Sequence, residues 1–168
     1  MTTPAADSDR ADAAEEVDRA AAAADSDAPD ELARRCAEAM WADDTASRAL
    51  GMTLDRVSAD AATVSMTVRP DMTNGHGTVH GGIIFALADS AFAFACNSRN
   101  ERTVAQACDI VFAAPARTGD RLVAEATARH RFGRNGVFDV RVSREGEVIA
   151  EFRGRSRTIG GAVIDDAP

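Results

Sequence analysis

The feature that most constrains this chain is the run of residues 83–96, which is apolar on every side when drawn as a helix. A surface helix presents one apolar stripe, whereas a helix that is apolar all round has to be surrounded by protein. The run contains Asp89 and falls short of the ~20 residues needed to span a bilayer. The chain therefore needs a wall around one long helix, predicted over about 81–97.

The segments before and after this helix have the pattern of β-strands, which could form a sheet around it. Apolar and polar side chains alternate with a period of two, which predicts strands at 51–58, 62–69, 103–114, 121–132, 136–144 and 147–158. Short polar or glycine turns join the last four. Consecutive antiparallel strands with a segregated helix indicate an α+β domain, in which one sheet face covers the helix and the other stays in water.

The acidity of the chain is confined to its first quarter. The net charge is −8, yet residues 1–44 hold 13 acidic residues and 4 arginines, a net −9, whereas the remainder is close to neutral. Residues 1–28 are poor in large apolar side chains and are predicted to be a disordered acidic tail. The folded domain is predicted over 29–160, opening with a helix near residues 30–40, and 161–168 form a C-terminal tail.

Composition also limits the partners and the compartment. An acidic pI near 4.8 argues against nucleic-acid binding. The three cysteines (Cys36, Cys96 and Cys108) form no CxxC pair, which favours reduced, buried thiols over zinc or disulfides. No secretory signal is visible. The chain is expected to be cytoplasmic and to bind neither membrane nor nucleic acid.

Asp89 is the one ionisable group in the apolar helix. A buried carboxylate is costly unless it is paired, hydrogen-bonded or neutralised. A salt bridge to an arginine would explain it structurally. The apolar neighbours and the mid-helix position favour a functional carboxylate instead.

The segment that enters this helix reads NGHGTVHGG, from Asn74 to Gly82. Gly81 and Gly82 would place backbone N–H groups without side-chain shielding at a helix N-terminus, where negative charge is stabilised. This predicts an oxyanion hole, although the glycines could simply let the chain enter the core. Asp89 lies roughly 12 Å of helix rise beyond Gly81. One site using both groups would therefore need two antiparallel helices across the two-fold axis of a dimer.

The histidines and the arginines give weaker indications of function. His76 and His80 lack a third ligand, so no metal site is predicted. The last strand places Arg153, Arg155 and Arg157 on one face, and Arg134 lies in a nearby turn. Arginine binds phosphate in a bidentate manner, so these residues either contact an anionic ligand such as coenzyme A or form a solvated face.

The run from Asn74 to Asn97, with HGG followed by LAD, resembles the hotdog-fold acyl-CoA thioesterases of the phenylacetate-pathway (PaaI) type. The similarity extends from about Trp41 to Gly160. It implies a hotdog fold, a curved antiparallel sheet wrapped around one central helix. It also implies hydrolysis of (hydroxy)phenylacetyl-CoA-type thioesters to the free acid and CoA in phenylacetate degradation, with no cofactor beyond the CoA of the substrate.

The resemblance also implies roles for individual residues. Asp89 would be the general base or nucleophile, and the Gly81 N–H, aided by His80, would polarise the thioester carbonyl. Asn74 would orient the thioester or the attacking water. Candidates for contacts with CoA are Gly82, Arg134, Arg155 and Arg157. The active sites would lie at the interface of a homodimer, paired further into a homotetramer.

Two other classes of function stay open. One is a non-catalytic acyl-CoA-binding or regulatory hotdog protein, against which the presence of Asp89 counts. The other is a hotdog dehydratase, which needs a second acid–base residue for which the sequence offers no matching histidine–acid arrangement.

Overall fold

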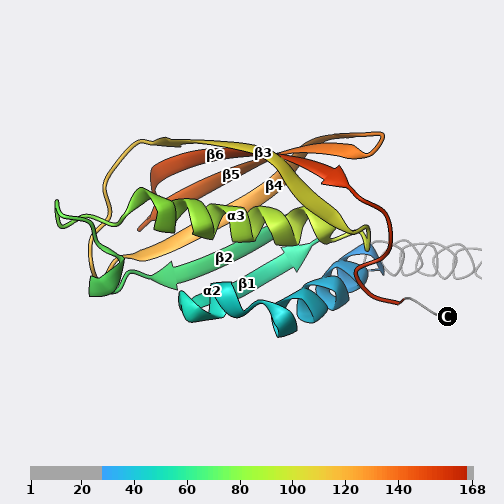
Figure 1. Cartoon of the computed structure of the whole chain (residues 1–168), viewed down its shortest axis with the longest axis horizontal. Helices are drawn as coiled ribbons and strands as arrows, with labels where there is room; N and C mark the ends of the chain where they lie inside the picture. Colours follow the sequence, from blue (N-terminus) through green and yellow to red (C-terminus); the bar gives the residue numbers. More distant parts are fainter. Residues whose placement is uncertain (1–27, 166–168) are drawn as a thin grey trace, which may run out of the picture.

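The computed structural model describes residues 28–165 (Figure 1). Its strands are β1 (Met52–Ser58), β2 (Ala61–Thr67), β3 (Thr103–Phe112), β4 (Arg121–Phe132), β5 (Asn135–Arg144) and β6 (Glu147–Thr158). They form one sheet in the order β1-β2-β4-β5-β6-β3, and every neighbouring pair is antiparallel. The long helix α3 (Gly81–Asn97) connects β2 to β3. The predicted α+β class is confirmed, as is the sequence of two strands, one long helix and four further strands along the chain.

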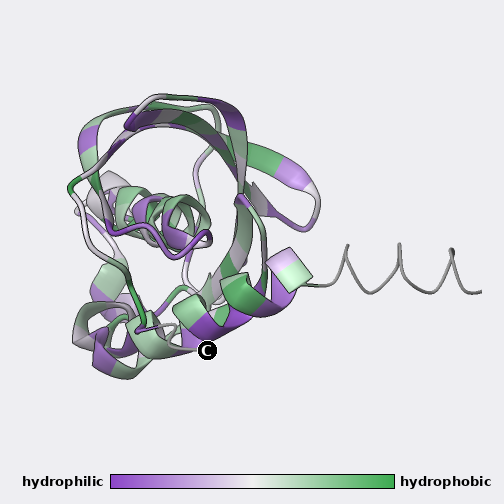
Figure 2. Ribbon diagram, turned by 90° about the vertical axis from the view of Figure 1, so that its right-hand side faces the viewer, coloured by the Kyte–Doolittle hydropathy of each residue, from purple (hydrophilic) through white to green (hydrophobic). Residues whose placement is uncertain are grey.

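Helix α3 lies inside the curve of the sheet, as Figure 2 shows along the helix axis. Leu87, Ala88 and Ala91 of α3 are fully buried against the sheet. Burial alternates along β6 from Ala150 to Arg157: Phe152, Gly154 and Ser156 are buried while the arginines between them are exposed. One sheet face therefore covers the helix and the other is wet, as the period of two predicts.

Two short segments cover the open side of the curved sheet. Residues 28–43 are helical, and α2 (Thr45–Ala49) follows, capped by Asp44, whose carboxylate accepts from the Ser47 N–H. Trp41 packs on Phe94 of α3 with ring centroids 5.9 Å apart. The helix expected near residues 30–40 is therefore longer. Of the predicted tail, only Ala28 lies within the described residues, and it is helical.

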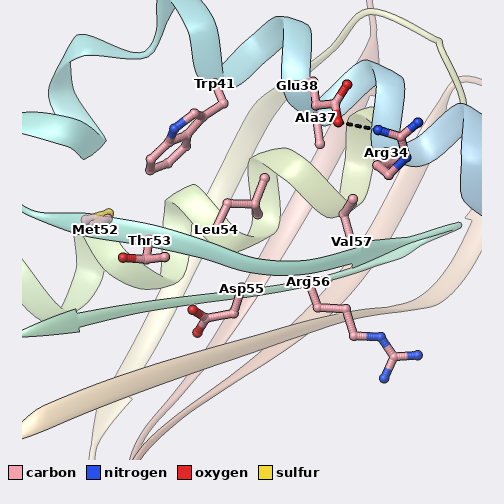
Figure 3. Close-up of a pocket in the computed structure, with 10 residues that line it drawn as sticks. All are labelled: Arg34, Ala37, Glu38, Trp41, Met52, Thr53, Leu54, Asp55, Arg56 and Val57. Atoms are coloured by element: carbon pink, nitrogen blue, oxygen red, sulfur yellow. Dashed lines mark hydrogen bonds and ion pairs between the residues drawn. The ribbon is translucent and has the colours of Figure 1, made fainter.

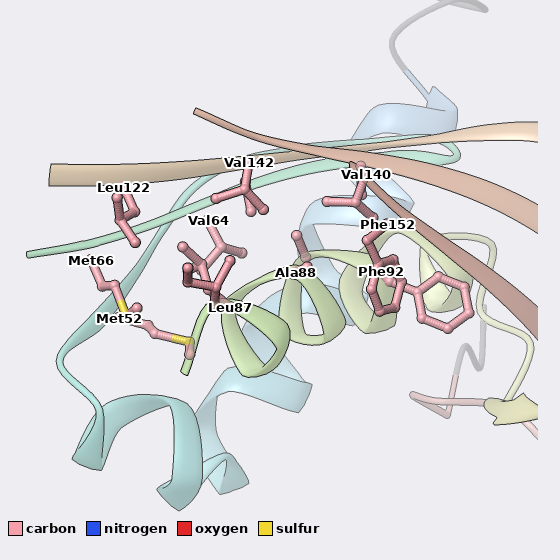
Figure 4. Close-up of a cluster of buried hydrophobic side chains, with 14 of the residues drawn as sticks. Met52, Val64, Met66, Leu87, Ala88, Phe92, Leu122, Val140, Val142 and Phe152 are labelled. Atoms are coloured by element: carbon pink, nitrogen blue, oxygen red, sulfur yellow. The ribbon is translucent and has the colours of Figure 1, made fainter. Parts of the chain in front are cut away.

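The core between sheet and helix is aliphatic at one end and aromatic at the other (Figure 4). Val64, Leu87 and Val142 fill the first part. In the second, the Phe92 ring packs edge-on against Phe138, with centroids 5.4 Å apart. The same ring also lies against Gly154 of β6, where a Cβ would come within 2.7 Å of a ring atom. The missing side chain lets α3 approach the β3–β6 corner closely.

The C-terminal end of α3 organises the segment after β6. The Asn100 side-chain oxygen accepts from Val163 N and Ile164 N, both at 2.9 Å, and its amide donates to the Ile164 carbonyl. The Arg102 N–H donates to Gly161 O at 3.0 Å. Residues 161–164, expected to be a tail, are thus tied to the folded domain.

Strand β3 is an edge of the sheet and is strongly exposed along its length. Val104, Val111 and Phe112 are 43%, 67% and 49% exposed. An apolar edge strand with free N–H and C=O groups favours pairing with another strand.

Candidate active site

Asp89 lies on the least covered side of α3. Gly82 is exposed and Ala86, Asp89 and Ala93 are half-buried, at spacings of four, three and four residues, so the four share one helix face. Apart from the aspartate, this face carries only small residues. A ligand or another backbone can therefore approach α3 closely here.

In the described part of the chain, the Asp89 carboxylate has no cationic partner. No arginine or histidine forms an ion pair with it anywhere in residues 28–165, so the structural explanation by a salt bridge does not hold. Among the described residues, one side-chain hydrogen bond reaches it, from the Cys108 thiol of β3, with Sγ 4.0 Å from Oδ1. Burial raises the pKa of Asp89, because a low-dielectric environment disfavours the charged form. A carboxyl group held in this way is suited to proton transfer.

A groove of about 450 Å³ opens beside Asp89. Its walls come from α3 and from the end of the helix over 28–43 with α2, and they are formed by Met40, Asp43, Asp44, Ala46, Ser47, Asp89, Ser90, Ala93 and Phe94. Ser47 and Ser90 share a hydrogen bond of 2.8 Å that ties the two walls together. Sequence reasoning missed the contribution of residues 40–47, because their only signal was a helical period and a cap.

The N-terminus of α3 is partly used by the chain itself. The His80 Nδ1 accepts from the Gly82 N–H at 3.0 Å, so His80 caps the helix. This leaves the ring hydrogen on Nε2 in the neutral imidazole. The Gly81 N–H has no hydrogen-bond partner in the described part of the chain. A Cβ on Gly81 would come within 3.0 Å of the Phe112 ring. Gly81, rather than Gly82, therefore offers the free donor.

Asn74 shapes the loop that precedes this helix. Its side-chain oxygen accepts from His76 N at 2.9 Å and from Thr78 N at 3.4 Å, while its amide donates to Thr78 Oγ1 at 3.1 Å. The loop is fixed further because His80 N donates to Met72 O. No contact joins Asn74 to Asp89 within the described residues.

The arginines of β6 lie on the sheet face away from α3. Arg153 pairs with Asp139, and Arg155 pairs with Asp109 at 3.0 Å. Arg134 donates to the Thr158 carbonyl at 2.9 Å, and for Arg157 the described residues provide no ion-pair partner. The expected single face is confirmed, but within one chain it is not brought to Asp89.

Other hollows and ligand groups are less suited to chemistry. A groove of about 530 Å³ between the helix over 28–43 and β1 is lined by Trp41, Leu54 and Val57 (Figure 3). It is mainly apolar, and Arg34 and Glu38 at its rim pair with each other. Within residues 28–165, no three His, Cys, Asp or Glu side chains gather as a metal site. Nor does any helix of that part combine the length and the apolar character needed to cross a membrane.

Comparison with known proteins finds a matching family, similar sequences and similar structures. The profile of the Thioesterase superfamily matches residues 76–151. The acyl-coenzyme A thioesterase PaaI of Escherichia coli is 43% identical over 132 residues, covering 78% of this chain and 94% of that protein. The structure of the E. coli PaaI protein from the phenylacetic acid degradation operon superimposes with a TM-score of 0.78, covering 79% of this chain and 97% of that one.

Two further matches cover less of the chain. A putative esterase of Deinococcus radiodurans is 45% identical over 108 residues, covering 62% of this chain and 73% of that protein. The TT0310 protein of Thermus thermophilus is 37% identical with a TM-score of 0.66, covering 67% of this chain and 96% of that one.

Proposed function

Because this chain belongs to the thioesterase superfamily, together with the PaaI acyl-coenzyme A thioesterase, we propose that it hydrolyses aryl acyl-CoA thioesters to the free acid and CoA. The substrates would be of the phenylacetyl and hydroxyphenylacetyl type, within phenylacetate degradation. The observation that carries the proposal is Asp89: a half-buried carboxylate that pairs with no cation in residues 28–165, at the wall of a groove.

The chemistry requires little beyond these groups. A thioester carbonyl is attacked by water, the proton of that water is taken up by a base, and the CoA thiolate leaves. Asp89 would take the proton as general base or attack the carbonyl itself as nucleophile. The free Gly81 N–H, at the positive end of the α3 dipole, would stabilise the negative charge that develops on the carbonyl oxygen.

A second copy of the chain would complete the site. Asp89 and Gly81 lie on one helix, roughly 12 Å of rise apart, too far to act on one carbonyl. The apolar edge of β3 and the small-residue face of α3 both favour a homodimer in which the helices run antiparallel. Asp89 would then act with Gly81 of the other subunit, and pairing of dimers into a tetramer is a further expectation.

Mixing two inactive variants tests this composite site. Asp89→Asn removes the carboxylate, and Gly81→Val places a bulky group against Phe112 at the oxyanion position. In a hybrid dimer one of the two sites has both native groups. Random pairing of equal amounts should restore about a quarter of wild-type activity. No recovery, with native mass spectrometry showing that the hybrids form, would contradict a shared site.

The remaining residues have supporting roles in the proposal. His80 would hold the first turn of α3 and present its Nε2 hydrogen to the substrate, and Asn74 would orient the thioester or the water through its loop. Gly82 would line the approach. Among the arginines, Arg134 and Arg157 would meet CoA phosphates, and Arg155 would have to leave Asp109 to do so. Replacing these arginines should raise KM for the acyl-CoA substrate and leave kcat nearly unchanged.

A thiol-release assay over a panel of acyl-CoA substrates tests the function directly. We expect phenylacetyl-CoA and hydroxyphenylacetyl-CoA to be turned over faster than acetyl-CoA, and dialysis against a chelator to leave the rate intact. Asp89→Asn is the matched control, since it preserves shape and removes the base. Binding of the panel without thiol release would favour the binding module, and a change in absorbance of an enoyl thioester would favour the dehydratase.

A further inference from the structure

Cys108 is brought to Asp89 by the geometry of the β3–β6 corner. In β3, Cys108 and Ile110 pack toward the core, while Asp109 between them pairs with Arg155 on the outer face. Cys108 lies directly across from Gly154, on which the Phe92 ring rests. Phe92 and Asp89 are three residues apart on α3 and share a side of the helix. The close approach at Gly154 therefore sets the distance between the thiol and the carboxylate.

The thiol is the single side-chain donor that reaches Asp89 in the described structure. Its Sγ is 4.0 Å from Oδ1, the long limit for a sulfur hydrogen bond, and Asp89 also lines the groove. The other titratable groups around Asp89 are acidic or neutral. Asp43 and Asp44 lie across the groove, and Cys96 lies one helical face away, where its thiol donates to the Ala93 carbonyl.

We propose that Cys108 is a positioning residue for the hydrolysis: its S–H holds Oδ1 of Asp89, so that Oδ2 faces the groove and the attacking water. This inference rests on the proposed function. A thiol suits the task because it is a weak donor. A hydroxyl at the same place would bond more strongly to the ionised carboxylate and make it a weaker base, whereas an alanine would leave the carboxylate free to turn.

The thiol is also suited to stay protonated. Burial, together with the neighbouring Asp89 and Asp109 charges, raises the pKa of Cys108 to about 11. At neutral pH the group is therefore a donor and not a thiolate. This sets the proposal apart from a catalytic cysteine, which needs a lowered pKa.

The test uses Cys108→Ser and Cys108→Ala in the full-length chain, with Cys96→Ala as the matched control that removes a thiol not directed at Asp89. Each variant is assayed as kcat/KM for phenylacetyl-CoA against pH, and the Asp89 carboxyl is titrated by ¹³C NMR without substrate. We expect the acid limb and the NMR midpoint to move down in pH for serine and up for alanine. For alanine, that displacement should lower the rate about threefold at a pH below the midpoint, since half a pH unit corresponds to this factor. The control should keep the wild-type midpoint.

Three outcomes would overturn the inference. The first is an unmoved acid limb and NMR midpoint in both Cys108 variants while Asp89→Asn is inactive. The second is a loss of 10²-fold or more in both variants without a displacement, which is the signature of a nucleophile. The third is an equal displacement in Cys96→Ala. Turnover retained by Asp89→Asn would instead refute the proposed function, and the NMR titration would still report whether the thiol holds the carboxylate.

Discussion

Asp60 and Asp89 are two carboxylates packed around α3, and their surroundings are opposite. Asp60, in the β1–β2 turn, pairs with Arg131 at 2.6 Å and with Arg99. Burial works against its charge, yet the two guanidinium groups prevail and lower its pKa. Asp89 is half-buried as well, but no cation among residues 28–165 pairs with it, and its pKa is raised. The difference teaches that neighbouring charges, more than depth, decide whether a buried acid is structural or reactive.

The Asp60 cluster joins three parts of the fold. Asp60 has a positive φ of 64° and its N–H donates to Ser98 Oγ at the end of α3. Arg131 of β4 also donates to the Cys96 carbonyl at 3.0 Å and lies 5.3 Å above the centre of the Phe138 ring. The turn, the helix end and the sheet are thus held by one ion-paired group, which is a structural role.

The largest expected effect separates the two carboxylates by activity. Asp89→Asn should lower kcat/KM by about 10²–10⁴-fold, the contribution of a positioned base. Asp60→Asn, which touches no part of the groove, should keep kcat within a few fold when rates are normalised to folded protein. Steady-state kinetics with phenylacetyl-CoA check both. Equal losses in the two variants would remove the distinction.

The next effect separates them by stability. Asp60→Ala leaves Arg131 beside the core with only its longer pair to the exposed Glu101, at 3.6 Å, whereas Arg131 and Asp60 are only 23% and 20% exposed. We expect the free energy of unfolding to fall by about 2–3 kcal/mol in urea titrations. Asp71→Ala is the control, because its pair with Arg69 is on the surface and should matter by less than about 1 kcal/mol. An Asp60→Ala protein as stable as this control would contradict the role of the cluster.

A smaller effect appears in the pH dependence of stability, with opposite signs. The raised pKa of Asp89 means that its ionised form costs stability, so Asp89→Asn should be more stable than wild type at pH 7. This advantage should shrink as the pH falls through the folded pKa and vanish below the unfolded value near 3.8. The Asp60 contribution is present above 3.8 and is lost as the pH falls through its lowered folded pKa. Urea titrations from pH 7 to pH 3 measure both, and identical profiles for the two variants would be the contrary result.

The smallest expected effect distinguishes the two arginines that pair with Asp60 by their contributions to stability. Arg99 is 53% exposed, and its pair with Asp60 is screened by solvent. Arg99→Ala should therefore cost about 0.5–1 kcal/mol, and Arg131→Ala clearly more. Chemical denaturation of the two variants under identical salt provides the measurement. A larger loss for Arg99→Ala than for Arg131→Ala would contradict the view that the less exposed pair contributes more.

Local patterns predicted most of the fold because they are local in origin. The period-two segments and the apolar run became β1 to β6 and α3 with ends shifted by a residue or two, and β3 ends at Phe112 instead of 114. Asp89 was identified because a charge within an apolar helix is conspicuous by itself. The glycine entry was identified for the same reason, although the cap by His80, which takes the Gly82 N–H, was not.

Features that depend on tertiary contacts could not be predicted. The Asp60 cluster joins residues separated by 39 positions for Arg99 and by more for Arg131, and an aspartate in a turn has nothing unusual in sequence. The contact of Cys108 with Asp89 depends on the absent side chain of Gly154 in a third element. Residues 40–47 became a wall of the groove only through the packing of a helix whose sequence showed amphipathicity and no more.

The exposed edge of β3 has a consequence for the protein concentration at which the enzyme would be active. Under the proposed pairing, each site exists only while two chains are associated, so mass action governs activity. Specific activity should therefore fall on dilution below the dissociation constant of the dimer, while the separated chains expose Val111 and Phe112 to one another and to other strands. Abundance, catalysis and resistance to aggregation would then rise and fall together.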